Sequence, residues 1–197
     1  MLLLLVRHAE STWNVERRWA GQSDPPLSRD GRRSCERLVA VLASAKLSAV
    51  ASSDLTRARQ TAGLLADGLG LDQALVEPRL GERAAPLWSG RTAVEIERRY
   101  PGRLEGWRSG LCCELPGAEP WAGFSARVEA GVMAVVQRFA SGSRILVVTH
   151  AGCLRTIEVG LGIGVRKTTN LDGYWVRVQD GRLQLVQNFH HRLPELP

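Results

Sequence analysis

The sequence predicts an α/β fold, a three-layer α/β/α sandwich with a mostly parallel central sheet and helices on both faces. The first observation is the alternation of short apolar runs with segments whose apolar residues recur every three or four positions, the spacing of a half-buried helix. The second is the continuous apolar character of residues 2–6 and 144–149, which is typical of parallel strands covered on both faces. No internal repeat interrupts this alternation.

The expected elements follow one another with short connections. Strands are expected at residues 2–6, 47–51, 75–76, 144–149, 176–178 and 183–186, and helices at 31–43, 55–69, 92–100, 121–139 and 153–160. Asp180 and Gly181 form a turn signal that joins the last two strands into a hairpin. Ser53 or Asp54 is expected to cap the helix at 55–69, which places Arg57 in its first turn.

Three segments lack a regular period and are expected to connect the elements around the sheet. Residues 13–24 run into Pro25 and Pro26, so they are expected to pass as a loop over the end of the first strand. Residues 78–90 are irregular. Residues 104–121 are rich in Gly, Trp, Cys and Pro, and they are expected to form a cover over the site.

Length and composition favour a single domain that spans residues 1–197. A chain of this length with 44% hydrophobic residues can bury one large core. The opening apolar run is too short to span a bilayer, no basic residue precedes it, and no small-residue cleavage site follows it. We therefore expect neither a membrane anchor nor a signal peptide, and no membrane partner.

The cysteines favour a reducing compartment, and the cytoplasm is the expected location. Cys35, Cys112, Cys113 and Cys153 show no spacing suited to a zinc site, and the adjacent pair cannot easily serve as a disulfide framework. Cys35 and Cys153 fall in helical patterns, where they are expected to behave as small apolar residues, whereas Cys112 and Cys113 are expected to be partly exposed.

The net charge of +6 does not indicate nucleic-acid binding. Basic residues are scattered and are balanced locally by glutamates, as in residues 95–99 (EIERR), and no basic stripe with interleaved aromatic residues is visible. No nucleic-acid partner is expected. The positive charge of the chain fits a small anionic substrate better than a nucleic acid.

Polar side chains from three segments are expected to meet at one rim of the sheet. Arg7 and His8 follow the first strand, and His150 follows the strand at 144–149. Arg57 begins the helix that follows the second strand. Because ligand sites gather outside the carboxyl ends of parallel strands, these four side chains are expected to lie together.

A phosphoryl group is the natural anion for such a cluster. The planar forks of Arg7 and Arg57 match phosphate oxygens and stay charged at any working pH. One of the two histidines can act as the nucleophile and form a phosphohistidine intermediate. The leaving alkoxide must then be protonated, so a carboxylic acid is required near the rim, and Glu82 in the irregular segment is the candidate.

The chain resembles the histidine phosphatase superfamily, also called phosphoglycerate-mutase-like, over nearly its whole length. The resemblance is carried by several spaced motifs in the expected order: residues 5–10 (LVRHAE) with Ser11 and Asn14, residues 21–28 (GQSDPPLS) with Gly31, residues 53–62 (SDLTRARQTA), residues 80–83 (LGER), residues 116–119 (PGAE) with Arg127 and Val128, and residues 148–152 (VTHAG).

The resemblance implies a role for each matching residue. It implies that His8 is the phosphorylated nucleophile and that Glu82 is the proton donor. It also implies a phosphate pocket made by Arg7, Arg57 and His150, with Asn14 as a further phosphate donor or nucleophile-orienting group. Gln22 matches a position that often touches the substrate phosphate, although a solvated loop glutamine is an open alternative. No metal and no cofactor are implied.

The chain departs from the family pattern at a few positions. Ala9 and Ala151 stand where the family usually has glycine after each histidine; the added methyl is tolerable if the backbone does not need a positive φ. Residues 85–90 read APLWSG where phosphatase-type members often show a Phe-Gly-x-Trp-x-Gly pattern. Glu10 and Glu77 therefore remain alternatives to Glu82, Glu10 being expected in a structural pair and Glu77 as a solvated loop carboxylate.

The tryptophans allow two interpretations. Trp13, Trp19, Trp88, Trp107 and Trp121 lie in or beside loops expected near the rim, where they form either an apolar collar for the leaving group or the packing of the loops onto the sheet. Trp175 in the hairpin is expected in the core.

The leading hypothesis is a metal-independent phosphomonoesterase that hydrolyses a small phosphorylated metabolite through a phosphohistidine on His8. One alternative is a 2,3-bisphosphoglycerate-dependent phosphoglycerate mutase, but mutases of the family carry a long basic insert, and the segment here is short and supplies only Arg108. Another is a non-catalytic module that binds a phosphorylated ligand. The oligomeric state stays open, a homodimer being one option.

Overall fold

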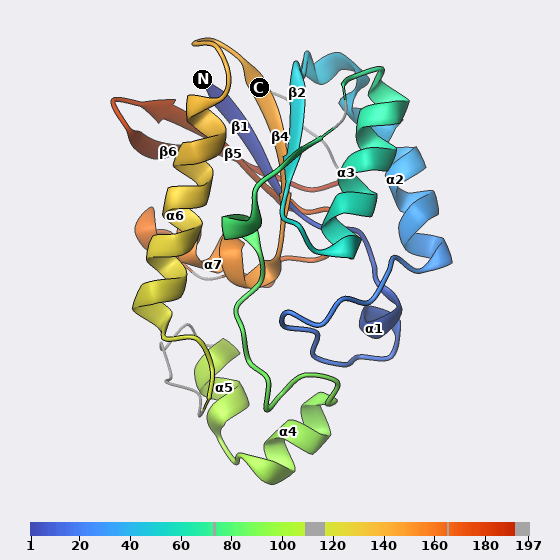
Figure 1. The fold of residues 1–197 in the computed structure, drawn as a ribbon, viewed down its shortest axis with the longest axis vertical. Coiled ribbons are helices and arrows are strands. Elements are labelled where there is room, and N and C mark those ends of the chain that lie inside the picture. The colour runs from blue at the N-terminus through green and yellow to red at the C-terminus, as the bar shows by residue number, and fades with distance from the viewer. Residues whose placement is uncertain (73, 109–116, 165, 192–197) are drawn as a thin grey trace.

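The structure, a computed structural model, describes residues 1–72, 74–108, 117–164 and 166–191 of the chain (Figure 1). The strands are β1 (Leu2–Arg7), β2 (Ala49–Ser52), β3 (Leu75–Val76), β4 (Arg144–Thr149), β5 (Gly173–Gln179) and β6 (Arg182–Phe189). The helices are α1 (Thr12–Val15), α2 (Arg29–Leu42), α3 (Thr56–Leu69), α4 (Ala93–Arg99), α5 (Arg103–Arg108), α6 (Trp121–Gln137) and α7 (Ala151–Gly160), with short 3₁₀ turns at Ala43–Ala45 and Pro78–Leu80.

The strands form one sheet in the order β3-β2-β4-β1-β5-β6. The β1–β4, β2–β4 and β2–β3 pairs are parallel, whereas β5 runs antiparallel to β1 and to β6. The expected mostly parallel sheet is therefore confirmed. The C-terminal hairpin is also confirmed and is longer than expected, and its turn places both Asp180 and Gly181 at positive φ, as the tight hairpin turn requires.

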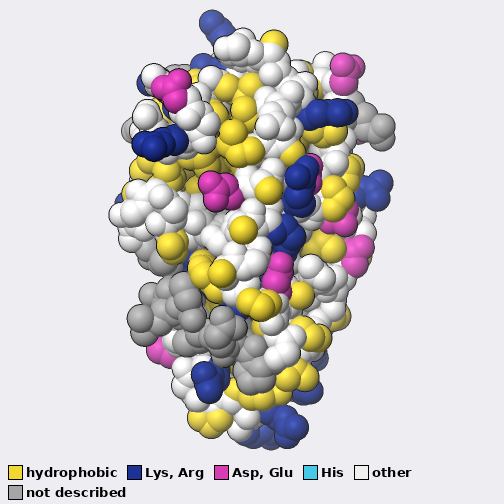
Figure 2. Space-filling model, turned by 60° about the vertical axis from the view of Figure 1, so that its left-hand side comes forward, with side chains coloured by type: hydrophobic (Ala, Val, Ile, Leu, Met, Phe, Trp, Pro, Cys, Tyr) yellow, Lys and Arg dark blue, Asp and Glu magenta, His cyan; other side chains and the backbone are white. Residues whose placement is uncertain are grey.

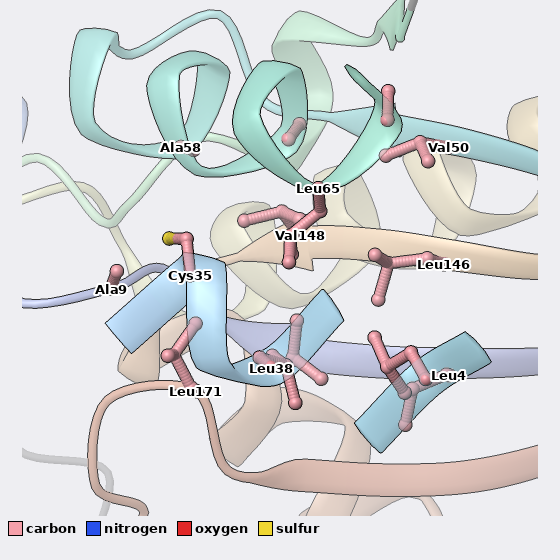
Figure 3. Packing of buried hydrophobic residues seen from close by; sticks show 14 of the residues in the cluster. Leu4, Ala9, Cys35, Leu38, Val50, Ala58, Leu65, Leu146, Val148 and Leu171 are labelled. Carbon is pink, nitrogen blue, oxygen red and sulfur yellow. The ribbon is translucent and has the colours of Figure 1, made fainter. Parts of the chain in front are cut away.

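Helices cover both faces of the sheet, which confirms the three-layer sandwich (Figure 1). On one face, Leu4, Val148 and other strand residues pack against α2 and α3, and Figure 3 shows Cys35, Leu38 and Leu65 of these helices beside the strands. On the other face, alternate residues of the same strands pack against α6 and α7. Both faces of β1 and β4 are apolar, which explains the unbroken apolar runs in the sequence.

Two of the four cysteines can be placed. Cys35 on α2 and Cys153 on α7 are fully buried free thiols, as expected of small apolar residues. Burial also raises the pKa of Cys35 to about 12, so this thiol stays protonated. The expected exposure of Cys112 and Cys113 lies outside the described residues.

The N-cap predicted for α3 was wrong. The capping position is Leu55, and neither Ser53 nor Asp54 caps the helix. The carboxylate of Asp24, in the loop before α2, takes this role, because it accepts hydrogen bonds from the Thr56 backbone N–H and hydroxyl, each at 2.6 Å. Arg57 nevertheless lies in the first turn, as expected.

Two segments contain helices where irregular structure was expected. In the segment after β1, α1 forms because the Ser11 hydroxyl and the Asn14 side chain cap each other's backbone N–H groups. In the expected cover segment, α5 extends through Arg108, while residues 109–116 lie outside the described part.

The connection after β1 and the long segment between β3 and α6 carry a small apolar core of their own. Trp88, Ile96, Leu104 and Trp107 are buried there, with Trp19 packed against them. In Figure 1 the helices α4 and α5 lie beyond the same end of the sheet, apart from the layers on its two faces. The carboxyl ends of the strands therefore face this tryptophan-rich core.

The surface fits the interpretation of the charge. On the face shown in Figure 2, Lys and Arg side chains are dispersed among apolar and acidic ones rather than gathered in a stripe. Among the described helices, none has the length and apolar character required to cross a bilayer.

Candidate active site

A cavity of about 150 Å³ lies where β1 and β4 end. Its walls combine three of the four expected rim residues with groups from the connections: Arg7, His8, Asn14, Arg18, Trp19, Ala20, Gly21, Arg57, Glu82, Trp107, Ala151, Gly152 and Arg155. The fourth, His150, is fully buried behind the wall. A larger hollow of about 560 Å³ lies beside β2, β3 and α3, but no histidine and no carboxylate line it. The chemistry therefore concentrates in the smaller cavity.

The hydrogen bonds of His8 determine its tautomer. The ring Nδ1 lies 2.7 Å from the carbonyl oxygen of Ala9, which can only accept, so Nδ1 carries the proton. The ring Nε2 lies 3.2 Å from Nε of Arg57, which can only donate, so Nε2 carries no proton and its lone pair accepts this hydrogen bond. Burial, together with the positive charges of Arg57 and Arg7, holds the pKa of His8 well below its usual range. The imidazole is thus neutral and presents Nε2 as a nucleophile.

His150 follows β4, the strand that pairs with β1, and its ring lies beside that of His8. The two rings lie 5.1 Å apart, and Nε2 of His150 lies 2.7 Å from the hydroxyl oxygen of Ser53. Its Nδ1 is buried and has no hydrogen-bond partner among the described residues. A buried polar atom without a partner costs about 1–3 kcal/mol, which a structure tolerates mainly where function requires it. Burial and the charge of Arg57 also lower the pKa of His150.

The two arginines are held by backbone carbonyl groups. Arg57, only 1% exposed, donates to the carbonyls of Ser23 at 2.7 Å and Gly21 at 2.8 Å, and Arg7 donates to the carbonyl of Thr168 at 3.0 Å. Burial lowers the pKa of both guanidinium groups, and the charge of Glu82 acts in the opposite direction. Guanidinium remains charged even so, because its ordinary pKa is above 12.

Glu82 is the carboxylate that the structure brings to the cavity. Its two oxygens accept hydrogen bonds from the backbone N–H groups of Arg83 at 2.8 Å and Gly152 at 3.1 Å. A Cβ atom at position 152 would overlap the Glu82 carboxylate in its present position, so the glycine leaves room for this close approach. The backbone at the start of α7 therefore fixes the acid opposite His8.

The other two acids weighed from the sequence lie elsewhere. Glu10 accepts a hydrogen bond from the Ser28 hydroxyl at 2.6 Å, at the start of α2. Glu77 pairs with Arg79 at 2.7 Å and caps a 3₁₀ turn. Neither residue lines the cavity.

Asn14 lines the cavity, whereas Gln22 does not. The Oδ1 atom of Asn14 accepts from the Ser11 backbone N–H and from the Asn170 amide, each at 3.1 Å. Gln22 is exposed, and its amide lies 3.4 Å from the carbonyl oxygen of Glu82. The open alternative of a solvated loop glutamine describes the position that Gln22 takes here.

The two alanines that replace family glycines adopt ordinary backbone conformations. Among the described residues, positive φ outside glycine occurs at Arg17, Lys46, Leu171 and Asp180, and at neither Ala9 nor Ala151. The condition under which the extra methyl groups are tolerable is therefore met. The backbone N–H of Ala9 donates to the Thr61 hydroxyl at 3.0 Å.

Some of the tryptophans line the cavity as a collar, and others are buried in the packing of the loops and the sheet. Trp19 and Trp107 line the cavity and pack edge to face at 5.4 Å, so they form part of a collar. Trp88 is 1% exposed and packs behind them, and Trp175 lies in the main core as expected.

Sequence reasoning missed several residues around the site. Ser53 orients His150, Asn170 contacts His8 and Asn14, and Arg18 and Arg155 add positive charge to the cavity wall. One signal could have found Asn170: it immediately precedes the hairpin, and an antiparallel β5 starts at the edge where β1 ends. No three His, Cys, Asp or Glu side chains come close enough to hold a metal ion within the described residues.

Comparison with known proteins agrees with this geometry. The model of the histidine phosphatase superfamily (branch 1) matches residues 3–174. The chain belongs to the histidine phosphatase superfamily. The probable phosphoglycerate mutase GpmB of Enterobacter sp. (strain 638) is 34% identical over 169 residues, which cover 80% of this chain and 74% of that protein.

Two solved structures show how similar this histidine phosphatase is to others in three dimensions. YhfR of Bacillus stearothermophilus has a TM-score of 0.82 at 27% identity, covering 94% of this chain and 95% of that one. A mycobacterial glucosyl-3-phosphoglycerate phosphatase in complex with VO3 has a TM-score of 0.80 at 27% identity, covering 94% of this chain and 97% of that one.

The lowered pKa values of His8 and His150 predict that both rings are neutral in the folded chain. They also predict that the fold loses stability toward acid pH. At pH 6 a free imidazole, with a pKa of about 6.5, is mostly protonated. We expect both histidines of this histidine phosphatase to stay neutral at that pH, with His8 protonated at Nδ1, as measured by ¹⁵N shifts of the ring nitrogens.

The same shifts determine how stability depends on pH. As the pH falls through 6.5, the unfolded chain takes up protons at these positions and the folded chain does not, so the free energy of unfolding decreases toward acid. Urea unfolding at pH 7.5 and 5.5 measures this decrease, which a His8→Asn variant should reduce. Imidazolium signals for His8 at pH 6 would contradict the assignment.

Proposed function

We propose that this protein is a metal-independent phosphomonoesterase that hydrolyses a small phosphorylated metabolite through a phosphohistidine on His8. The observation that carries the proposal is the neutral His8 ring, whose Nε2 lone pair lies in one small cavity with the buried Arg57, the half-buried Arg7 and one carboxyl group. This combination supplies a nucleophile, a phosphate clamp and a proton donor together.

In the first step, Nε2 of His8 attacks phosphorus and the bond from phosphorus to the leaving oxygen breaks. Arg7 and Arg57 bind the equatorial oxygens and stabilise their charge in the transition state, and Asn14 and His150 donate further hydrogen bonds. Glu82, protonated at this stage, transfers its proton to the leaving oxygen. The ring becomes a cation, and the Nδ1–H···O=C bond to Ala9 stabilises it.

In the second step, water attacks the phosphohistidine. The Glu82 carboxylate takes a proton from this water, and Nε2 of His8 leaves as a neutral ring. Orthophosphate is then released from the arginine clamp. Because both steps use groups of the chain itself, no metal ion and no cofactor are required.

The cavity walls favour a small substrate. A volume of about 150 Å³ accommodates a phosphoryl group and a short leaving group, and Trp19 and Trp107 limit the space beyond it. We place the enzyme in the cytoplasm, which the buried free thiols of Cys35 and Cys153 support. Nucleic acid and membranes are not part of the proposal.

The nucleophile can be tested by trapping. With ³²P-labelled substrate in the presence of EDTA, we expect label on the wild-type chain after rapid denaturation in alkali, which preserves phosphohistidine. His8→Ala should show no label and almost no turnover, because the lone pair is absent. Arg138→Ala, an exposed change remote from the cavity, is the control. An active His8→Ala variant would refute the mechanism.

The proton donor can be tested with leaving groups of different basicity. Glu82→Gln should lower kcat/KM for glycerol phosphate by about 10²–10⁴, the usual contribution of general acid catalysis. The loss for p-nitrophenyl phosphate should be far smaller, because nitrophenolate leaves without a proton. Equal losses for both substrates would assign Glu82 a role other than proton donation. Glu77→Gln, on a carboxylate outside the cavity, is the matched control.

A phosphoglycerate mutase is the second candidate, because curated relatives with 34% identity carry that name. A mutase must keep its phosphohistidine from water, whereas the proposed enzyme passes the phosphoryl group to it. With 3-phosphoglycerate, and with 2,3-bisphosphoglycerate added to prime the enzyme, we expect release of orthophosphate. Formation of 2-phosphoglycerate faster than orthophosphate, followed by ³¹P NMR, would favour the mutase instead.

A further inference from the structure

The connection between α7 and β5 reaches the active site through Asn170. Its amide Nδ2 donates to the carbonyl oxygen of His8 at 2.8 Å and to Oδ1 of Asn14 at 3.1 Å. Asn170 thus contacts the backbone of the nucleophile and the side chain of a cavity residue at once. Nothing in the mechanism above uses it.

The backbone around Asn170 is held firmly. The Arg7 N–H donates to the carbonyl of Asp172 and the Leu171 N–H donates to the carbonyl of Arg7, each at 3.0 Å. Leu171 adopts a φ of 66°, which is rare for a residue with a branched side chain, and its side chain is 1% exposed in the main core (Figure 3). Such a conformation persists only where its surroundings impose it, so Asn170 projects from a fixed support.

The hydrogen bonds assign every atom of the two amides without ambiguity. The Ser11 N–H can only donate, so the Asn14 atom that it contacts is Oδ1. The His8 carbonyl can only accept, so the Asn170 atom that it contacts is Nδ2, and both of its N–H groups are used. Both lone pairs of Asn14 Oδ1 are likewise used. The Nδ2 group of Asn14 is left with its two N–H groups, and it makes no hydrogen bond to any described residue.

We propose that Asn170 is a positioning residue that holds the Asn14 amide with its N–H groups turned toward the substrate phosphate. The inference rests on the proposed function, because it concerns the phosphate of that reaction. If the amide turned over, Oδ1 would face the phosphate oxygens, and an attractive contact would become repulsive. Asn170, which does not itself line the cavity, prevents this together with the Ser11 N–H by occupying the lone pairs of Oδ1, while its second N–H keeps the His8 carbonyl in place.

Two substitutions separate orientation from packing. Asn170→Asp keeps the shape but, when ionised, offers only acceptors. The new carboxylate therefore repels Asn14 Oδ1 and favours a turned-over amide, at the expense of the Ser11 hydrogen bond. Asn170→Ala removes the contact without demanding this rotation. We expect kcat/KM for p-nitrophenyl phosphate to fall about 100-fold for Asn170→Asp, the effect of misplacing one group, and less for Asn170→Ala. The inhibition constant for vanadate should rise in parallel. A packing role predicts the reverse order, because Asp fills the space that Ala leaves empty.

A double-mutant cycle tests whether the effect passes through Asn14 and corrects for the added charge. In an Asn14→Ala background, Asn170→Asp should lower kcat/KM only slightly, by the effect of the added charge and of the lost hydrogen bond to the His8 carbonyl. Fully additive losses would overturn the proposal. Thr169→Ala is the control, because it removes the neighbouring 2.5 Å bond to Asp172 without touching Asn14 or His8. Thermal unfolding of each variant should stay close to that of the wild type.

The two proposals fail in different ways. Without turnover or phosphohistidine in the wild-type chain, the proposed function is wrong. With both present, an Asn170→Asp variant as active as Thr169→Ala would refute the positioning role alone.

Discussion

The concentration of buried positive charge at the ends of β1 and β4 is the constraint on which the rest of the site depends. Arg57 is buried and Arg7 is half-buried, and desolvation lowers the pKa of each guanidinium and of the two neighbouring imidazoles. Glu82 is the one carboxyl group among the described residues that line the cavity. Under the proposed function, a site so rich in cationic groups suits a dianionic phosphate, and the same positive charge keeps His8 neutral before the substrate arrives.

Hydrogen bonds from the residues around the cavity hold each of these groups in place. Carbonyl groups of the connection before α2 hold Arg57, the first turn of α7 holds Glu82, and Ser53 at the end of β2 holds His150. Each support comes from an element whose place in the sandwich is fixed by one of the two main cores. The tryptophan-rich third core borders the same cavity, because Trp19 and Trp107 belong to both.

Much of this arrangement could be predicted from the sequence, because the strongest signals are local. The apolar runs before His8 and before His150 identify two central strands, and parallel strands necessarily bring their carboxyl ends to one edge. The residues that were missed depend on long-range geometry instead. Asn170 reaches the site only because β5 reverses direction, and Asp24 replaced the expected cap of α3 because a distant loop happens to pass the helix start. The helix α5 was missed because its few residues carry too short an apolar period to recognise.

The Nδ1–H···O=C bond between His8 and Ala9 has a consequence for the flow of protons through the catalytic cycle. A serine or cysteine nucleophile has to lose a proton before it attacks, whereas this ring already holds its only proton on the far side, bonded to a carbonyl oxygen. Under the proposed mechanism only one proton is therefore transferred in each half of the cycle, first from Glu82 to the departing alcohol and then from the attacking water to Glu82. A single carboxylate would thus serve as both acid and base.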